Sequence, residues 1–279
     1  MDNTNSILLN RFFTRNTFKQ VIDEEESSTY IAAIHKYVAD STEKTNRECV
    51  GEIYQYLKKR YQNEYYYKNT LLNKLLLGVH SPRTTTALTE VPIANSKADF
   101  ILINGKAVVY EIKTALDNFD RLDGQIEDYY KAFSRVVVVT PEENFESLQQ
   151  KLQNSPVGIC VLTKKDTLSM RKEPIEYTQE LSKLIMFKIL RKSEYEQILI
   201  KYFGTLPAVS QFEYYRACQK LFERLSTDIA YKEFIKILKL REKIDIVEYS
   251  KIPYELKFLV YFSNYKKSDY EKLHHFLSI

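Results

Sequence analysis

The sequence is poor in the residues that mark several protein classes. Its 279 residues include six glycines, seven prolines, three cysteines and no tryptophan. The cysteines Cys49, Cys160 and Cys218 lie far apart and lack the spacing of metal ligands. A sparse, odd number of cysteines fits a reducing compartment. This composition excludes a disulfide-stabilised scaffold or a zinc ribbon, and we expect a cytoplasmic protein.

Long apolar runs and phosphate-binding loops are also missing. No window approaches the roughly 18 uninterrupted apolar residues of a membrane helix. The first residues, MDNTNSILLNRFFTRN, lack the basic start and apolar core of a secretory signal. No G-x-x-x-x-G-K-[ST] motif occurs in the sequence. We therefore expect no membrane association and no nucleotide-driven motor within this chain.

The charge is close to balanced. The net charge is +4 with 28% charged residues, which excludes a strongly basic nucleic-acid coat protein. Lysine and arginine outnumber the acids only in residues 171–279. A mildly basic second half is compatible with nucleic-acid contacts and also with ordinary solvated helices.

Hydrophobic periodicity predicts a mixed α/β chain. A helix starts after Thr45 or Asn46 and runs to about Tyr61, and another covers about 71–79. Strands are indicated where β-branched residues gather between turn signals. These segments are 88–93, 98–103, 107–113, 135–140 and 157–163, with helices at 122–133 and 141–153. From about residue 178 the pattern is helical only. We expect a helical segment at 1–45, a central α/β domain at 46–170 and an all-helical domain at 171–279.

The stretch from Glu90 to Tyr129 carries the chemistry. Asp99 opens an apolar strand, and the next strand ends in Glu111-Ile112-Lys113. Two carboxylates at a sheet end offer oxygen ligands to a hard divalent cation, and the main-chain carbonyl of Ile112 is a third candidate ligand. A lysine beside them can orient a water molecule or hold a phosphate. This pattern is typical of metal-dependent phosphodiester hydrolysis.

Strand alternation makes the shared site testable. With a two-residue turn at Asn104-Gly105, Asp99 would share a face with Tyr110, and Glu111 would point to the other side of the sheet. One extra residue brings the two acids to one face. We therefore expect a three-residue loop with Gly105 at positive φ, or a bulge in a flanking strand.

The following helix adds a second set of polar groups. Arg121, Gln125 and Tyr129 recur at intervals of four, so they share one helix face. The guanidinium of Arg121 can hold a phosphate, and Gln125 can bridge a metal-bound water or a phosphate. Tyr129 can donate to a phosphate or support Gln125. We expect these three residues to contact nucleic acid, with Gln125 also taking part in catalysis.

Asp99, Glu111-x-Lys113 and Gln125-x-x-x-Tyr129 together resemble the PD-(D/E)XK nuclease superfamily in its RecB-like form. The longer string from Asp117 to Tyr129 is similar to a small family of uncharacterised bacterial proteins that join such a core to a helical C-terminal part. The resemblance implies a restriction-endonuclease-like αβββαβ core with a mixed sheet, Mg²⁺ (replaceable by Mn²⁺) and DNA as substrate. Ala98 stands where the motif has proline.

The family often adds an acid from the helix before the sheet. Glu48 is the first candidate for this metal ligand, Glu52 the second, and Glu90 on the first strand the third. The sequence thus predicts a nuclease in which Asp99, Glu111 and Lys113 carry the chemistry.

The main alternative is a catalytically silent module on the same fold that binds nucleic acid or protein. RNA remains a possible substrate in place of DNA. The helical C-terminal part offers a surface for a homodimer or a protein partner. Defence, repair and mobile-element biology are all compatible settings.

Overall fold

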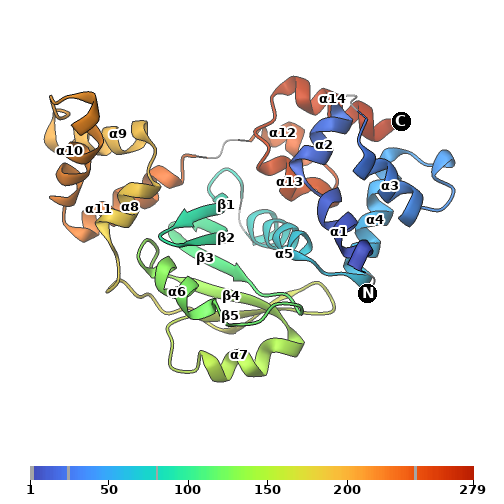
Figure 1. Cartoon of the computed structure of the whole chain (residues 1–279), viewed down its shortest axis with the longest axis horizontal. Coiled ribbons are helices and arrows are strands. Elements are labelled where there is room, and N and C mark those ends of the chain that lie inside the picture. Colours follow the sequence, from blue (N-terminus) through green and yellow to red (C-terminus); the bar gives the residue numbers. More distant parts are fainter. Residues whose placement is uncertain (1–2, 24–25, 80, 242–243) are drawn as a thin grey trace. The chain divides into compact units, whose positions relative to one another are not determined.

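The computed structural model describes residues 3–23, 26–79, 81–241 and 244–279 (Figure 1). The chain forms two compact units, one of Met1–Pro82 with Lys243–Ile279 and one of Arg83–Glu242. The second unit is thus inserted, along the sequence, between two halves of the first. These units divide the chain differently from the expected domains 1–45, 46–170 and 171–279.

The first unit is helical in its described part. Its elements are α1 (Asn3–Phe12), α2 (Arg15–Ile22), α3 (Ser28–Tyr37), η1 (Ser41–Glu43), α4 (Asn46–Arg60), α5 (Glu64–Leu71), η2 (Leu72–Val79), α12 (Ile246–Ser250), η4 (Tyr254–Leu256), α13 (Lys257–Tyr261) and α14 (Lys267–Ser278). Helix α4 begins at the expected place because Thr45 and Glu48 form a reciprocal capping box. The helix expected at 71–79 is a π-helix that continues α5.

The second unit is built on a mixed six-stranded sheet in the order β1-β2-β3-β4-β5-β6. The strands are β1 (Thr86–Ile93), β2 (Ser96–Asn104), β3 (Lys106–Ile112), β4 (Val136–Pro141), β5 (Gly158–Leu162) and β6 (Leu168–Lys172). Strands β3, β4 and β5 are parallel, and the other neighbouring pairs are antiparallel. The mixed α/β prediction is therefore confirmed.

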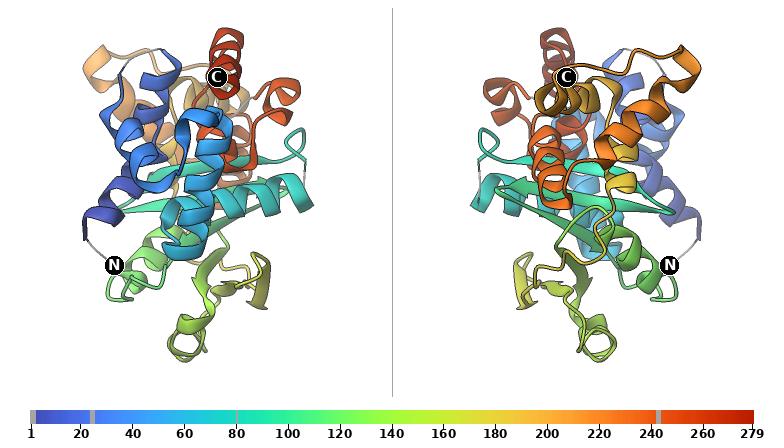
Figure 2. Two further views of the ribbon diagram at one scale, coloured as in Figure 1. Left: turned by 90° about the vertical axis from the view of Figure 1, so that its right-hand side faces the viewer. Right: turned by 90° about the vertical axis from the view of Figure 1, so that its left-hand side faces the viewer.

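Helices join the parallel strands and follow the sheet. Helix α6 (Leu122–Tyr130) links β3 to β4, and η3 (Glu142–Asn144) with α7 (Phe145–Lys151) links β4 to β5. Parallel neighbours require such crossovers. After β6 come α8 (Lys183–Ile189), α9 (Lys192–Phe203), α10 (Gln211–Glu223) and α11 (Thr227–Leu238). These four form one group in the yellow-to-orange part of the chain, seen from two further sides in Figure 2.

One hydrophobic core spans the sheet and these later helices. Val109 and Val136 of the sheet belong to the same buried cluster as Phe187 of α8, Leu199 of α9 and Phe234 of α11. Helices α8 to α11 therefore complete the sheet unit, and the expected boundary at residue 171 falls inside it.

Strand β6 was not expected, because residues 166–177 are rich in charged and turn-forming residues. The strand pairs with β5 at the edge of the sheet and is partly exposed along its length. Edge strands tolerate charged side chains, which weakens their signal in the sequence. Among the described helices none is long and apolar enough to cross a membrane.

Candidate active site

The β2–β3 hairpin has the expected register. Ile103 pairs with Ala107 and Asn104 with Lys106, which leaves Gly105 at the tip with a φ of 67°. Phe100 pairs with Tyr110, and the same register carried one residue further sets Asp99 opposite Glu111. Residues directly opposite each other point to the same face. The predicted three-residue loop is confirmed, and it brings the two acids to one side of the sheet.

Glu111 lies at the centre of a hydrogen-bonded cluster. Its side chain is almost fully buried, at 2% exposure. Gln125 Nε2 donates to Oε1 at 2.6 Å, and the Tyr129 hydroxyl donates to Oε2 at 2.5 Å. Lys113 Nζ lies 2.9 Å from Oε1. The buried carboxylate is thus paired with a cation and oriented by two further donors, as a buried charge requires.

Gln125 connects Glu111 to Lys113. Its amide oxygen accepts a hydrogen bond from Lys113 Nζ at 2.8 Å while its amide nitrogen donates to Glu111. Gln125 and Tyr129 are one turn apart on α6, so a single helix face supplies both donors. The main-chain oxygen of Lys113 accepts from Thr140 Oγ1 at 3.1 Å. Helix α6 and strand β4 therefore fix the end of β3 from two sides.

Tyr129 contacts Glu111 from inside the fold. Its side chain is fully buried, and its hydroxyl also lies 3.0 Å from the Lys97 carbonyl oxygen. The phenol therefore holds Glu111 in place, and its contact with nucleic acid stays a prediction. Burial raises the pKa of the Tyr129 hydroxyl, and the charges of Glu111 and Asp99 raise it further. Both carboxylates therefore act on the same hydroxyl.

Asp99 is held within β2 by hydrogen bonds to both neighbouring strands. Its Oδ2 accepts a hydrogen bond from the Ile112 main-chain nitrogen at 2.8 Å. The Thr89 hydroxyl donates to the Asp99 main-chain oxygen at 2.7 Å. The N–H and C=O of a strand residue point to the same side. The Ile112 carbonyl is therefore expected to face the edge of β3 on which Asp99 lies.

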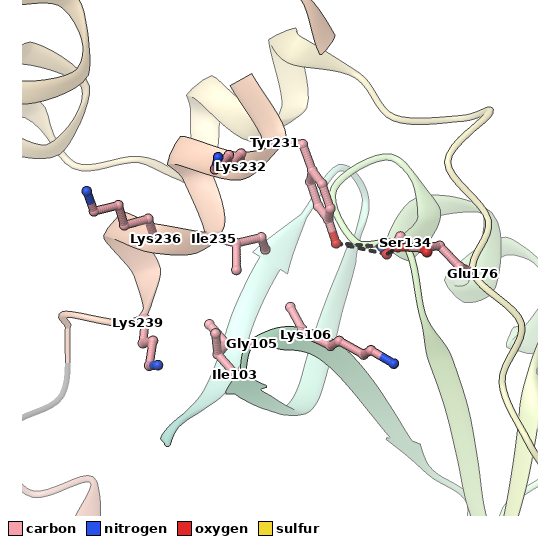
Figure 3. A pocket seen from close by; sticks show the side chains of 11 residues that line it. Ile103, Gly105, Lys106, Ser134, Glu176, Tyr231, Lys232, Ile235, Lys236 and Lys239 are labelled. Atoms are coloured by element: carbon pink, nitrogen blue, oxygen red, sulfur yellow. Dashed lines mark hydrogen bonds between the residues drawn. The ribbon is translucent and has the colours of Figure 1, made fainter. Parts of the chain in front are cut away.

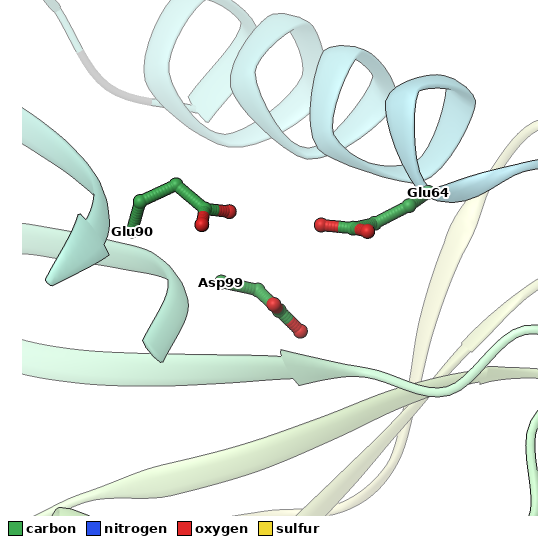
Figure 4. Close-up of side chains that lie close together, drawn as sticks. All are labelled: Glu64, Glu90 and Asp99. Carbon is green, nitrogen blue, oxygen red and sulfur yellow. The ribbon is translucent and has the colours of Figure 1, made fainter. Parts of the chain in front are cut away.

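Glu90 comes close to Asp99 from the neighbouring strand (Figure 4). Carboxylate oxygens of these two residues lie within 4.8 Å of each other. Glu90 adopts a left-handed φ of 56° inside β1 and pairs with Lys97 at 2.7 Å. A side chain in this conformation is strained, and such strain gathers at functional sites. The structure therefore places the third candidate acid beside the site.

The other residues expected at the site have surroundings of their own. Arg121 is the exposed N-cap residue of α6, without a side-chain capping hydrogen bond. Glu48 belongs to the helical unit, where its Oε2 accepts from Thr45 N at 2.8 Å and Thr45 Oγ1 at 2.9 Å. The main-chain hydrogen bond lowers the pKa of Glu48, and the side-chain one adds to this. Glu52 pairs with Lys44 at 2.7 Å. Metal binding by Glu48 or Glu52 stays a prediction.

Residues of the loop after β3 were missed as part of the site. Asp117 Oδ2 accepts from the main-chain nitrogen and the hydroxyl of Thr114, both at 2.7 Å. Asn144 Nδ2 donates to the Thr114 carbonyl oxygen at 3.1 Å. These bonds fix the chain directly after Lys113. The Thr-x-x-Asp spacing is a local turn signal that the sequence already contains.

The donor set fits a hard divalent cation. Asp99 and Glu111 could supply carboxylate oxygens and Ile112 a carbonyl oxygen, and a carboxylate oxygen of Glu90 lies within 4.8 Å of one of Asp99. Oxygen ligands of this kind are those of Mg²⁺. Glu111 has about four lone-pair positions and receives three donors from Lys113, Gln125 and Tyr129, which leaves capacity for a metal.

Comparison with known proteins locates the chain in a family. The family model of bacteriophage P4 protein cII matches residues 57–250, which include the whole acid cluster. The chain belongs to the bacteriophage P4 protein cII family. Protein cII of Enterobacteria phage P4 is 30% identical over 122 residues, covering 42% of this chain and 46% of that protein. The chain thus matches about half the length of this curated relative.

Similarity to a solved structure is weaker. A protein of unknown function from Silicibacter pomeroyi aligns at 15% identity and a TM-score of 0.29, covering 46% of this chain and 87% of the other.

Proposed function

We propose that this member of the cII family is a metal-dependent nuclease that hydrolyses phosphodiester bonds, with DNA as its substrate. The observation that carries the proposal is the hairpin register that sets Asp99 opposite Glu111, with Lys113 at 2.9 Å from the Glu111 carboxylate. Two acids, a lysine and an amide, with Glu111 and Lys113 buried, exceed what the packing of a sheet requires.

Each residue has a distinct task in this proposal. Asp99, Glu111 and the Ile112 carbonyl would hold Mg²⁺ or Mn²⁺, which supplies a water of lowered pKa and neutralises charge on the phosphate. The Lys113 ammonium orients the attacking water or holds the scissile phosphate. Gln125 fixes the positions of Lys113 and Glu111, which contact each other directly, through one hydrogen bond to each. Arg121, exposed at the start of α6, is free to swing toward a phosphate.

The decisive experiment is a cleavage assay with plasmid, linear DNA and RNA, with and without Mg²⁺ or Mn²⁺. We expect metal-dependent products that disappear in Asp99→Ala and Lys113→Ala. Lys151→Ala is the matched control, because Lys151 forms an exposed pair with Asp123 at 2.6 Å in the same unit. Products absent from the wild type, or equal in all variants, would refute the proposal. DNA binding in EDTA without products would instead identify a silent binding module.

Metal binding can be followed separately by thermal unfolding. A ligand that binds only the folded state raises its stability by about 2.7 kcal/mol at a hundred times its Kd. We expect Mg²⁺ to stabilise the wild type and Lys113→Ala but not Asp99→Asn. Glu48→Gln, Glu52→Gln and Glu90→Gln then identify the additional acid. Glutamine also serves in a capping box, so Glu48→Gln preserves the start of α4.

The setting is also a proposal. The relative that matches this chain is a protein of a bacteriophage. Among defence, repair and mobile-element biology, this similarity favours the last.

A further inference from the structure

A cavity of about 470 Å³ lies between the β2–β3 hairpin and helix α11. Its floor is apolar, formed by Ile103 and Ala107 of the hairpin and Ile235 of α11. Figure 3 shows Ile235 extending from the helix above the hairpin tip. The volume lies within the usual range of ligand sites, which combine apolar walls with a few polar groups.

The rim of this cavity carries four lysines. Lys232, Lys236 and Lys239 follow one another at intervals of four and three, so they share one face at the end of α11, and Lys106 lies on the hairpin (Figure 3). Lys232 and Lys236 are exposed and one turn apart, an arrangement in which like charges repel. Within the described ranges, none of the four side chains forms an ion pair.

The acid that lines the cavity does not neutralise these lysines. Glu176 Oε2 pairs with Arg135 at 3.3 Å, and its Oε1 accepts from Ser134 Oγ at 3.3 Å. The cavity therefore has a positive rim above an apolar floor. A ligand complementary to both must carry anionic groups on an apolar, planar or flexible body.

Tyr231 supplies an ordered aromatic ring at the same place. Its hydroxyl accepts from the Ser134 main-chain nitrogen at 3.1 Å and donates to Ser134 Oγ at 3.0 Å. The ring is thus held by its distal end, as Figure 3 shows. Aromatic rings beside basic side chains bind unpaired nucleobases, because stacking and phosphate contacts are made together.

We propose that this cavity binds single-stranded nucleic acid, with phosphates on the four lysines and a base against Tyr231 and the apolar floor. The proposal deepens the nuclease proposal and rests on it. Ile103 and Ala107 lie on the sheet face that carries Asp99 and Glu111, by the register of the hairpin. Ala107 and Glu111 are four positions apart on β3, which is roughly 13 Å at strand spacing. A nucleic-acid strand held in the cavity would have to continue past this distance to reach the acid cluster.

A single strand fits better than a duplex. In a duplex the bases are stacked on one another and only phosphates and groove edges face the protein, so the apolar floor would have no partner. An acidic peptide would satisfy the lysines but has no planar group suited to the ring of Tyr231.

The test is binding of a fluorescein-labelled oligothymidylate to the full chain in EDTA, measured by anisotropy at several salt concentrations. The double variant Lys232→Gln/Lys236→Gln should weaken binding about tenfold or more and reduce the salt slope by roughly 1.4, at about 0.7 per phosphate contact. The matched control is Lys164→Gln/Lys165→Gln, which removes the same charge from exposed positions after β5. The control should leave affinity and slope unchanged.

Further probes separate the occupants. An abasic oligonucleotide of equal length should bind more weakly than oligothymidylate to the wild type and equally to Tyr231→Ala. An equal loss of oligonucleotide affinity in Lys232→Gln/Lys236→Gln and in the control Lys164→Gln/Lys165→Gln would overturn the proposal. So would a duplex that binds as tightly as the single strand, or polyglutamate that displaces the oligonucleotide equally well.

The two proposals fail separately. Pocket-dependent binding without metal-dependent cleavage would refute the nuclease alone. Metal-dependent cleavage together with oligonucleotide binding that is unchanged in Lys232→Gln/Lys236→Gln would refute the cavity proposal alone.

Discussion

Tyr129 and Tyr130 are neighbours on α6 with different hydroxyl environments. The Tyr129 hydroxyl donates to Glu111 at 2.5 Å, whereas the Tyr130 hydroxyl is buried without a hydrogen-bond partner among the described residues. The two side chains share their chemistry and their near-complete burial. They therefore provide an internal comparison of a hydroxyl that positions the acid with one that does not.

Tyr129→Phe should lower cleavage about 10- to 100-fold, as expected for loss of a group that orients a metal ligand. It should also cost about 1–3 kcal/mol of unfolding free energy, because Glu111 loses a donor in a buried place. Tyr130→Phe should change stability by less than about 0.5 kcal/mol and leave cleavage intact. Urea unfolding and cleavage rates check both variants. Equal behaviour of the pair would contradict the role given to Tyr129.

Gln125→Glu should make stability dependent on pH in the acid range. The new carboxylate would stand where an amide nitrogen now lies 2.6 Å from Glu111, and two adjacent carboxylates cannot both ionise cheaply. Their repulsion raises the pKa of one of the two carboxyl groups in the folded state. The variant therefore loses unfolding free energy at neutral pH, and it regains this free energy as the pH falls and one carboxyl group is protonated. Gln125→Met, similar in shape but uncharged, should lose stability without this dependence. Urea midpoints measured over a pH series test the difference.

Glu90→Gly should stabilise the fold and weaken metal binding at the same time. Relieving the left-handed strain of the side chain should raise the free energy of unfolding by about 1–2 kcal/mol. The greater flexibility of glycine in the unfolded chain should lower it again by roughly 0.5–1 kcal/mol. Ala94→Gly is the control, since Ala94 has a φ of 52° in the adjacent β1–β2 turn. It should stabilise similarly and leave the Mg²⁺ response unchanged. A Glu90→Gly variant with unaltered Mg²⁺ affinity would remove Glu90 from the site.

Stability should fall at alkaline pH through Tyr265 and Tyr270. Burial raises the pKa of each to about 12, with Asp269 adding to the shift of Tyr265 and Asp245 to that of Tyr270. The pKa of each tyrosine is higher in the folded state than in the unfolded state, where it is near 10. Each tyrosine therefore contributes fully to the free energy of unfolding below pH 10, and this contribution is lost as the pH rises toward 12. Each tyrosine should contribute roughly 1–2 kcal/mol after solvent screening. Tyr265→Phe and Tyr270→Phe should each flatten the urea-midpoint profile in that window.

Local signals in the sequence were enough to locate the acids. Alternation along β2 and β3 and the Asn104-Gly105 turn specify which residues face each other, because the side-chain period of a strand is fixed at two. The capping box at Thr45 and Glu48 similarly predicts the start of α4. The spacing of Gln125 and Tyr129 is likewise a property of one helix.

Non-local relationships could not be read in the same way. Nothing near Tyr129 in the sequence specifies that its hydroxyl meets Glu111, since their contact depends on how α6 packs on the sheet. Val136 and Phe187 belong to one core because α8 packs on the sheet. The sequence does not specify this contact, since the apolar face of the sheet could be covered by any amphipathic helix. The left-handed φ of Glu90 has no sequence marker, because glycine or asparagine is the usual residue there.

The helical unit is interrupted along the chain, and this has a consequence for synthesis on the ribosome. The main-chain nitrogen of Asn46, at the start of α4, donates to the carbonyl of Ile279 at 2.7 Å, and Asn46 Nδ2 donates to Phe276 at 3.0 Å. Helices α1 to α5 are made first yet lack this partner until α14 has emerged. Domains made continuously fold during translation. The sheet unit, complete once α11 is made, can therefore fold while the unit that begins the chain is still waiting for its last helix.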